Sequence, residues 1–221
     1  GMSRFFPADK ILCTGNPVRQ NLLEGAVQKD DAVRSFGLVP GKRTILVIGG
    51  SLGARTLNES ILGNLPLVKQ QNNVQFVWQT GKYYSSAIKE ELDRRGCPDN
   101  LKVMDFIADM KQAYAAADLV ISRAGAGSIS EFCLLGKPVI LVPSPNVAED
   151  HQTKNALALV QKNAALYVPD AEARRSLLPL AINTVADHEK LETLSRNIIQ
   201  LARPNAASDI ADEVIKLAEG K

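Results

Sequence analysis

The chain has 221 residues, of which 45% are hydrophobic, and its formal net charge is only +2. This length is enough for one large α/β domain or two small ones. A near-neutral charge gives no electrostatic footprint for a nucleic-acid partner, and an aromatic content of 5% leaves few rings on which single-stranded bases could stack. We therefore expect no nucleic acid among the partners of this chain.

Cysteine usage and hydropathy favour a reducing, cytoplasmic location. The three cysteines are widely spaced, and Cys13 and Cys133 fall in apolar segments, so both are expected to be reduced core residues. No signal peptide and no apolar run of membrane-spanning length is recognisable. The opening Gly1-Met2, followed by Ser-Arg-Phe-Phe-Pro, is unlike the start of a compact domain, and we expect a piece of a longer protein.

Strands and helices are expected to alternate from Lys10 to about Val168. Nearly continuous apolar runs are typical of parallel strands that are covered on both faces. The expected strands are residues 11–14, 44–49, 74–79, 101–105, 118–122, 138–142 and 165–168. The expected helices between them are 54–62, 84–95, 110–116, 128–135 and 150–162. Such repeated units predict an α/β fold with a doubly wound parallel sheet, in which ligands bind beyond the carboxyl ends of the strands.

The pattern changes to helices alone after Pro169, at 171–186, 188–202 and 206–218. Pro179 is expected to break or restart the first of them, because proline lacks the amide hydrogen that a helix interior uses. The last has an apolar stripe that includes Val214 and Leu217, which indicates packing against the sheet or a face turned toward a further domain. Residues 21–41 are polar and predict a surface loop with a short helical turn.

The most informative motif is Arg123-Ala-Gly-Ala-Gly-Ser-Ile-Ser-Glu131, which follows an expected buried strand and opens a helix. Small residues at Gly125 and Gly127 let the backbone approach a bound group, and the free amides of a helix start near Ser128 favour an anion. Glu131 lies about one turn further on, where its carboxylate can reach the same pocket. A phosphate on the amides and a sugar hydroxyl on the carboxylate predict a nucleotide-sugar site.

A second turn, Gly49-Gly-Ser-Leu-Gly-Ala54, also joins a buried strand to a helix. Ser51 could offer its hydroxyl and amide to a phosphate, and Gly53 could let the helix start lie close to a ligand. The alternative is an ordinary tight turn with Ser51 as the N-cap of the helix. The spacing differs from G-x-G-x-x-G and no acidic residue ends the next strand, so dinucleotide binding is disfavoured.

Three further segments could bind a nucleotide sugar, although each alone is better explained by ordinary turns and exposed side chains. Arg19 follows the turn Gly15-Asn-Pro-Val and could reach a base or a phosphate. The backbone of Ile107 could pair with the edge of a pyrimidine. His151 and Gln152 lie in the first turn of a helix and could hydrogen-bond sugar hydroxyls.

Other chemistries find no support in the sequence. No His/Cys pair has metal-ligand spacing, and Glu149 and Asp150 are adjacent rather than spaced as in a calcium loop. A nucleophile elbow and a Walker loop are also missing from the sequence. We therefore expect no metal and no cofactor in this chain.

Taken together and in order, the motifs at 14–19, 49–54, 106–110, 123–131 and 150–156 resemble the C-terminal half of the MurG family. These peptidoglycan glycosyltransferases transfer N-acetylglucosamine from UDP-N-acetylglucosamine to lipid I, which is undecaprenyl-pyrophosphoryl-N-acetylmuramoyl-pentapeptide, and so make lipid II. The resemblance implies one half of a GT-B glycosyltransferase. Residues 1–17 would be a residual linker with the first strand, and 18–221 a UDP-sugar-binding Rossmann-like domain with C-terminal helices.

The resemblance assigns the nucleoside to three residues. Arg19 and Ile107 would recognise uracil, Ile107 through its backbone. Glu131 would hold the ribose hydroxyls.

It assigns the diphosphate to Ser51, helped by the amides of Gly127 and Ser128. Gln152, with His151 beside it, would read the hydroxyls of N-acetylglucosamine. Some relatives carry Gln where His151 stands, and the residues before this pair also vary.

The same resemblance implies what other parts of the enzyme supply. The missing N-terminal domain would bind lipid I, carry the proposed base and face the membrane, so that the full-length protein is peripheral on the inner face of the cytoplasmic membrane. Inversion at the anomeric carbon would proceed by direct displacement without a metal.

Three alternatives stay open at this point. The chain could be a fragment of a UDP-N-acetylglucosamine epimerase, or a natural donor-binding subunit that needs a separate acceptor subunit. It could also be a nucleotide-sensing module without transfer chemistry.

Overall fold

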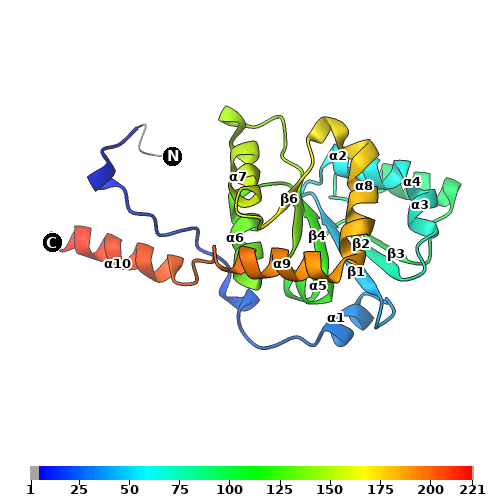
Figure 1. Ribbon diagram of the computed structural model, residues 1–221, viewed down its shortest axis with the longest axis horizontal. Coiled ribbons are helices and arrows are strands. Elements are labelled where there is room, and N and C mark those ends of the chain that lie inside the picture. The colour runs from blue at the N-terminus through cyan, green and yellow to red at the C-terminus, as the bar shows by residue number, and fades with distance from the viewer. Residues whose placement is uncertain (1–4, 221) are drawn as a thin grey trace.

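The centre of the computed structural model, which describes residues 5–220, is a six-stranded parallel sheet (Figure 1). The strand order is β3-β2-β1-β4-β5-β6. The strands are β1 (Arg43–Ile48), β2 (Val74–Gln79), β3 (Leu101–Met104), β4 (Leu119–Ser122), β5 (Val139–Leu141) and β6 (Leu166–Tyr167). The order reverses between β1 and β4, which is the topological switch point of a doubly wound fold. The predicted fold class is therefore confirmed.

Helices cover both faces of this sheet. One face carries α2 (Arg55–Gly63), α3 (Leu65–Lys69), α4 (Ser85–Arg95) and α8 (Asp170–Ala186). The other carries α1 (Lys29–Ser35), α5 (Met110–Ala116), α6 (Ala126–Leu135) and α7 (His151–Val160). A further helix, α9 (His188–Ile199), places Leu191 in the first core and Ile198 in the second. It thereby joins the two layers.

Alternation along the strands explains why both faces are apolar. In β1, Ile45 and Val47 belong to one core, whereas Leu46 and Ile48 belong to the other. Successive side chains of a strand point to opposite faces, so a continuous apolar run fills both layers at once. The core beside α2 and α4 also contains Trp78, whose indole Nε1 donates to Oδ1 of Asn58 at 3.0 Å.

The amino ends of β1 and β4 are joined by Asp118, whose side chain is only 8% exposed. Its Oδ1 accepts hydrogen bonds from Nζ of Lys29 at 2.6 Å and from Nη1 of Arg43 at 2.9 Å. Its Oδ2 accepts the amide hydrogen of Thr44 at 2.8 Å. One carboxylate thus satisfies a strand amide and two cations at the end of the sheet opposite the switch-point loops.

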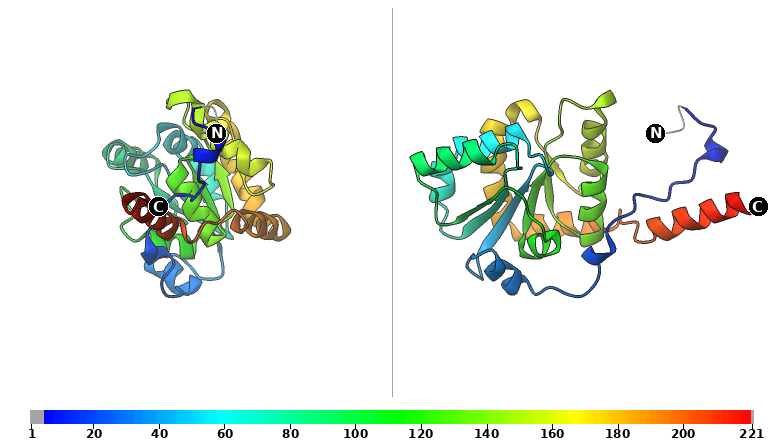
Figure 2. Two further views of the ribbon diagram at one scale, coloured as in Figure 1. Left: turned by 90° about the vertical axis from the view of Figure 1, so that its left-hand side faces the viewer. Right: turned by 180° about the vertical axis from the view of Figure 1, so that it is seen from behind.

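The two ends of the described chain project from the same end of the body. Figure 1 shows α10 (Ala206–Ala218) extending beside the segment that precedes Gly15, and Figure 2 shows the same arrangement from behind. The two segments meet at Gly15, where an added Cβ would lie 2.8 Å from Cβ of Arg203. On α10, Leu217 is 78% exposed, so this stripe does not pack against the sheet. That alternative for the last helix is wrong.

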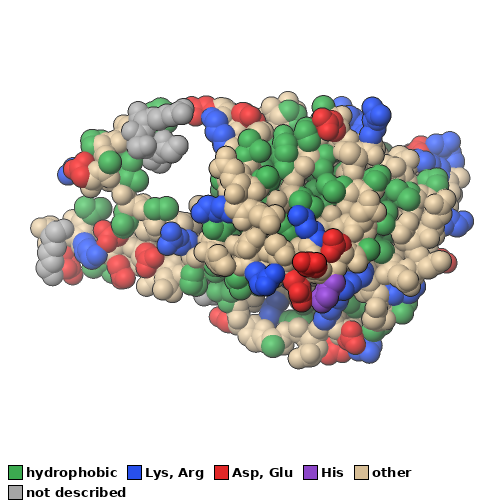
Figure 3. Space-filling view, viewed as in Figure 1, with side chains coloured by type: hydrophobic (Ala, Val, Ile, Leu, Met, Phe, Trp, Pro, Cys, Tyr) green, Lys and Arg blue, Asp and Glu red, His purple; other side chains and the backbone are tan. Residues whose placement is uncertain are grey.

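The surface agrees with the near-neutral composition. In the space-filling view, acidic and basic side chains are interspersed over the face that α9 crosses, while hydrophobic side chains lie along both projecting segments (Figure 3). Within residues 5–220, none of the helices combines the length and the apolar character that a membrane span requires.

The predicted strand at residues 11–14 is wrong. This stretch is irregular and follows a short 3-10 helix, η2 (Ala8–Lys10), in the projecting segment, where no neighbouring strand is available to pair with it. Cys13 is accordingly exposed rather than a core residue, whereas Cys133 is buried as expected. The opening at Gly1 and Met2 lies outside the described residues.

Two other sequence-based expectations also need correction. Helix α8 continues through Pro179, because the buried Leu177, Leu178 and Ala181 around it pack against the sheet and offset the missing amide hydrogen. The helical turn expected within residues 21–41 is present as α1, but it buries Ala32 and Val33, so this part of the segment belongs to the core and not to a surface loop. Helix α3 was not predicted.

Candidate functional site

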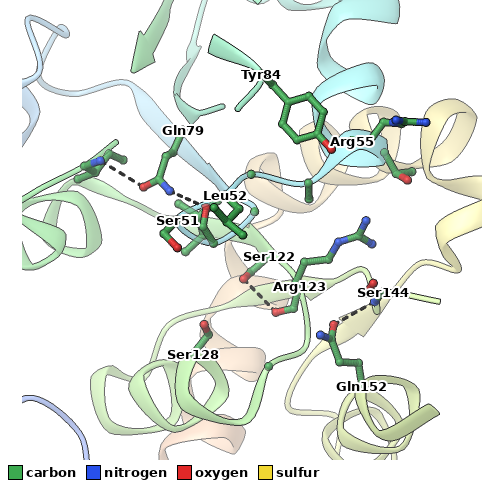
Figure 4. A pocket seen from close by; sticks show the side chains of 18 of the residues that line it. Ser51, Leu52, Arg55, Gln79, Tyr84, Ser122, Arg123, Ser128, Ser144 and Gln152 are labelled. Atoms are coloured by element: carbon green, nitrogen blue, oxygen red, sulfur yellow. Dashed lines mark hydrogen bonds between the residues drawn. The ribbon is translucent and has the colours of Figure 1, made fainter. Parts of the chain in front are cut away.

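A cavity of about 910 Å³ opens at the carboxyl ends of the strands, around the switch point between β1 and β4. Figure 4 shows Ser51 and Leu52 from the β1–α2 turn on one side, with Ser128 of α6 and Gln152 of α7 on the other. Most of the sequence-predicted residues line it, namely Arg19, Ser51, Ile107, Ser128, Glu131 and Gln152. The structure thus brings together residues that lie far apart in the sequence, from Arg19 to Gln152.

The cavity receives the amino ends of two helices. Helix α2 has Ala54 as its N-cap and α6 has Gly125, and neither N-cap residue makes a side-chain capping bond. The first amides of a helix have no acceptor within it, and the helix dipole places partial positive charge there. Both ends therefore favour an anion in the cavity. Ser51 is exposed in the preceding turn, so its alternative assignment as the N-cap of α2 is wrong.

The glycines of the two turns serve different purposes. Gly53 has φ +81°, and an added Cβ would lie 2.0 Å from the carbonyl oxygen of Thr80. The sequence predicts that Gly53 makes room for a ligand. The structure shows instead that the close approach of the loop containing Thr80 requires a glycine here. By contrast, a Cβ at Gly125 or Gly127 would meet no atom within 4 Å. The space beside the start of α6 is left open by the protein itself.

Gln79 connects the two loops that flank β2. Its Nε2 donates to the carbonyl oxygen of Gly50 at 2.9 Å, and its Oε1 accepts the amide hydrogen of Ile107 at 3.2 Å (Figure 4). The side chain of Gln79 is buried, so both bonds are shielded from water. The amide hydrogen of Ile107 is consequently engaged within the protein.

Glu131 is the acidic group of the cavity, and its side chain is 16% exposed. Oε2 accepts a hydrogen bond from the hydroxyl of Tyr114 at 2.7 Å, and Oε1 lies 3.2 Å from Nη2 of Arg19. Burial is the main cause that raises the pKa of Tyr114 above its usual value, and the hydrogen bond to Glu131 adds to it. Tyr114 therefore stays protonated and keeps donating to the carboxylate.

Gln152 fixes the loop that follows β5. Its Oε1 accepts the amide hydrogens of Ser144 at 2.9 Å and Ala124 at 3.2 Å. Asn155, one turn later in α7, donates to the carbonyl oxygen of Ala124 at 3.1 Å. The start of α7 is thus hydrogen-bonded to the entries of two loops, with Gln152 at the cavity wall.

A partly buried ion pair supports the same wall. Nη1 of Arg123 donates to the carbonyl oxygens of Val142 and Pro143, each at 3.1 Å, and to Oδ1 of Asp170. Oδ2 of Asp170 accepts from the hydroxyl of Thr56 at 2.9 Å. These contacts tie the ends of β4 and β5 to the starts of α8 and α2.

Two of the predicted residues lie outside the lining of the cavity. The side chain of His151 is exposed, and its Nδ1 lies 2.9 Å from the carbonyl oxygen of Ala148. Gly127 is exposed on the first turn of α6. Just before His151, Glu149 and Asp150 both have positive φ, 52° and 51°, so α7 starts from an unusual backbone conformation.

Sequence reasoning missed several residues of the site. Tyr114, Gln79 and Asp170 line the cavity and hold its other residues in place. Gln79 gave a usable signal, because a glutamine that ends an otherwise apolar buried strand needs a hydrogen-bond partner. Tyr114 gave none, since a tyrosine among alanines in α5 is equally expected in a core. Across residues 5–220, no group of three or more His, Cys, Asp or Glu side chains could hold a metal ion.

Fold and cavity together define a doubly wound α/β domain with a cavity at its switch point that is suited to an anionic ligand. More particularly, the chain belongs to glycosyltransferase family 28, whose C-terminal domain model matches residues 44–214. This confirms the resemblance to the MurG family on which the site residues were assigned.

Curated relatives carry one enzyme name, UDP-N-acetylglucosamine–N-acetylmuramyl-(pentapeptide) pyrophosphoryl-undecaprenol N-acetylglucosamine transferase. The protein from Bacteroides fragilis is 64% identical over 219 residues, which are 99% of this chain and 58% of the relative. The protein from Bacteroides thetaiotaomicron is 63% identical over 221 residues, which are 100% of this chain and 59% of the relative. The chain thus spans less than two thirds of the length of either relative.

Solved structures agree. The crystal structure of MurG from Acinetobacter baumannii superposes with a TM-score of 0.71 at 31% identity, covering 88% of this chain and 55% of that one. A UDP-GlcNAc 2-epimerase from Neisseria meningitidis, bound to UDP-GlcNAc, gives a TM-score of 0.72 at 18% identity, over 97% and 58% of the two chains. At that identity the second likeness shows the fold alone.

Proposed function

We propose that this chain is the donor-binding half of an inverting glycosyltransferase that transfers N-acetylglucosamine from UDP-N-acetylglucosamine to lipid I, giving lipid II. The observation that carries the proposal is the pairing of two uncapped helix starts with Glu131 in one cavity. Membership in glycosyltransferase family 28 and the name shared by the relatives supply the substrate class.

In the proposed complex the diphosphate lies between the starts of α2 and α6. Ser51 and the amides of Gly127 and Ser128 contact its oxygens, and the open space at Gly127 gives the phosphate room to approach. The N-acetylglucosamine then extends toward Gln152, with His151 at the outer edge. This orientation is supported by the place of Gln152 on the opposite wall of the cavity (Figure 4).

The nucleoside is placed at the other end of the cavity. Glu131 accepts hydrogen bonds from the ribose hydroxyls, while Arg19 and the carbonyl oxygen of Ile107 meet the uracil. These groups converge because α5 and α6 lie on the same face of the sheet and both start at the carboxyl ends of its strands.

The chemical contribution of this half is electrostatic. The two helix starts stabilise the negative charge that develops on the departing UDP, and they do so with dipoles that are already oriented. Acceptor positioning and proton removal belong to the remaining part of the longer protein, together with the binding of lipid I. No residue of this chain is assigned to the reacting atoms. Residues before Val18 act as the linker between the parts, and the whole protein works on the inner face of the cytoplasmic membrane.

The direct test is calorimetric titration of this chain with UDP and with UDP-N-acetylglucosamine, using GDP as the mismatched nucleotide. Both uridine ligands should bind, and Glu131→Ala should weaken UDP binding by about 1–3 kcal/mol, because two hydroxyls lose their acceptor. Glu90→Ala, an exposed carboxylate on α4, is the matched control and should bind like the unchanged chain. No heat and no thermal shift with either uridine ligand would refute the proposal.

Assays of the whole protein distinguish glycosyl transfer from the alternative functions. Incubation with UDP-N-acetylglucosamine and a lipid I analogue should release UDP and extend the lipid. Epimerised sugar in the absence of the lipid would favour an epimerase instead. Activity that appears only after a second polypeptide is added would favour a donor-binding subunit.

A further inference from the structure

The hydroxyl of Tyr114 is held in a fixed position relative to α6. Tyr114 lies on α5, is 2% exposed, and donates its hydroxyl hydrogen to Oε2 of Glu131 at 2.7 Å. Its ring packs edge-on against Phe132, with centroids 5.9 Å apart and planes at 88°. Phe132 is fully buried and directly follows Glu131 in α6. Phe132, the residue after Glu131, therefore also fixes the ring of Tyr114, whose hydroxyl donates to Glu131.

The two partners of Glu131 differ in how easily they can leave. The side chain of Arg19 is 56% exposed and belongs to an irregular segment, so water can replace its contact with Oε1. Tyr114 is enclosed and cannot turn away without leaving the core. A carboxylate has about four lone-pair positions. Tyr114 occupies one of these positions and Arg19 another. About two positions remain, one for each of the hydroxyls at the 2′ and 3′ carbons of a ribose.

A glutamate side chain has three rotatable bonds, and immobilising such a chain at the moment of binding lowers affinity. A buried donor that already holds one carboxylate oxygen removes part of that cost. It also points the free lone pairs in one direction, which favours a vicinal diol over a single hydroxyl.

We propose that Tyr114 is a positioning residue that orients Glu131 toward a ribose diol and so makes the cavity select ribonucleotides over 2′-deoxyribonucleotides. The inference rests on the proposed function, because it takes UDP as the ligand, but it adds a residue and a selectivity that the family assignment does not contain. Tyr114 acts through Glu131 and not on the ligand.

Calorimetry with UDP and 2′-deoxy-UDP tests the inference. Tyr114→Phe keeps the ring and its packing against Phe132 and removes only the hydroxyl. The variant should bind UDP about tenfold more weakly, as expected for the loss of roughly one hydrogen bond to a charged group. Its affinity for 2′-deoxy-UDP should fall less, so that the ratio of the two affinities moves toward one. An unchanged ratio would overturn the inference.

A double-mutant cycle distinguishes positioning from a general structural role. If Tyr114 acts through Glu131, adding Tyr114→Phe to Glu131→Ala should leave UDP affinity where Glu131→Ala alone puts it. Additive losses would overturn the inference. Tyr83→Phe is the matched control, because Tyr83 is exposed and outside the cavity lining. It should leave both affinities unchanged.

The same experiment keeps the two proposals apart. If the unsubstituted chain binds UDP and Tyr114→Phe leaves the ratio of the UDP and 2′-deoxy-UDP affinities unchanged, only the role of Tyr114 is overturned. A chain that binds neither nucleotide would overturn the proposed function together with this inference.

Discussion

Arg19 and Glu131 are separated by 112 positions in the sequence, yet Nη2 of Arg19 lies 3.2 Å from Oε1 of Glu131. Asn16 is bound to the same helix, since its Nδ2 donates to Oγ of Ser130 at 3.1 Å. The segment that enters the domain is therefore attached to α6 at the carboxylate proposed for the ribose. If Glu131 binds the ribose as proposed, ligand binding and the position of this segment are linked through one side chain.

Replacing Arg19 with Met removes the guanidinium and keeps most of the aliphatic stem. We expect UDP affinity to fall about fivefold or more, because donors directed at the base are lost. Stability should change by less than about 1 kcal/mol, since exposed ion pairs contribute little. Calorimetry and thermal melting measure the two effects. Arg34→Met removes another exposed ion pair, remote from the cavity, and is the control. Tighter UDP binding by Arg19→Met would show that Arg19 competes with the ribose.

Gly53→Ala should destabilise the fold strongly. The new Cβ would lie 2.0 Å from the carbonyl oxygen of Thr80 at a residue with φ +81°, so backbone strain and a backbone clash combine. We expect a loss of about 3 kcal/mol or more in urea denaturation. Gly50→Ala is the matched control, with φ +84° but no atom within 4 Å of the added Cβ, and should cost about 1–2 kcal/mol. Equal losses would mean that the two loops do not approach closely.

Gly127→Ala should separate stability from binding. The residue is in the first turn of α6 and an added Cβ meets no atom, so alanine should raise stability by roughly 0.5–1 kcal/mol. UDP affinity should nevertheless fall, because the methyl group enters the space proposed for the phosphate. Gly63→Ala makes the same change at the far end of α2, where the added Cβ also meets no atom. It should leave binding unchanged. A Gly127→Ala variant with normal UDP affinity would remove Gly127 from the site.

Asp118→Asn should weaken the sheet at its amino ends. The carboxylate accepts from Lys29, Arg43 and the amide of Thr44, and neutralising it leaves two cations without their partner. Because both cations are partly exposed and can return to water, we expect a loss of about 2 kcal/mol rather than the 3–5 kcal/mol of a fully buried pair. Urea denaturation measures it, with the exposed Asp31→Asn as a control that should change stability by less than about 0.5 kcal/mol. A loss no larger than that of the control would contradict the proposed role.

Lys137 should make stability depend on pH under alkaline conditions. Burial lowers its pKa to about 8, although its Nζ donates to the carbonyl oxygen of Ala117 at 3.0 Å. The unfolded chain keeps the proton up to about pH 10.4, so between these values the unfolded state binds more protons and stability rises with pH. Lys137→Met should abolish this rise.

The measurement is the difference in unfolding free energy between Lys137→Met and the unchanged chain at about pH 7 and about pH 9.5. Other titrating groups cancel in that difference. The unfolding free energy of Lys137→Met should exceed that of the unchanged chain most at the lower pH, and the difference should shrink as pH increases and Lys137 loses its proton. A difference that stays constant would mean that the pKa of Lys137 is not lowered.

Much of the fold could be predicted, because a parallel sheet covered on both faces demands continuous apolar runs. The prediction for β2 coincides with the structure, and the bounds of α5 and α10 were also predicted without error. The strand predicted at 11–14 is wrong because this segment has the same apolar composition as the true strands. It differs from them only in having no neighbouring strand among the described residues with which to pair. The helix break predicted at Pro179 is also wrong, because packing of α8 against the sheet outweighs the local tendency of proline to interrupt a helix.

The site was predictable at the level of loops but not of contacts. Carboxyl ends of parallel strands meet at one edge, so the turns near Gly49, Gln79 and Arg123 had to converge. The hydrogen bond from Tyr114 to Glu131 could not be foreseen, since it depends on how α5 packs against α6. His151 was assigned by resemblance, and the structure leaves its side chain pointing to solvent.

The contact between Gly15 and Arg203 has a mechanical consequence. The segment that enters the domain and the segment that leads into α10 lie close together there, so any structure joined to both would be held at two neighbouring points. Gly15 and Arg19 belong to the same short stretch, so a displacement at this contact would be transmitted to the side chain that pairs with Glu131.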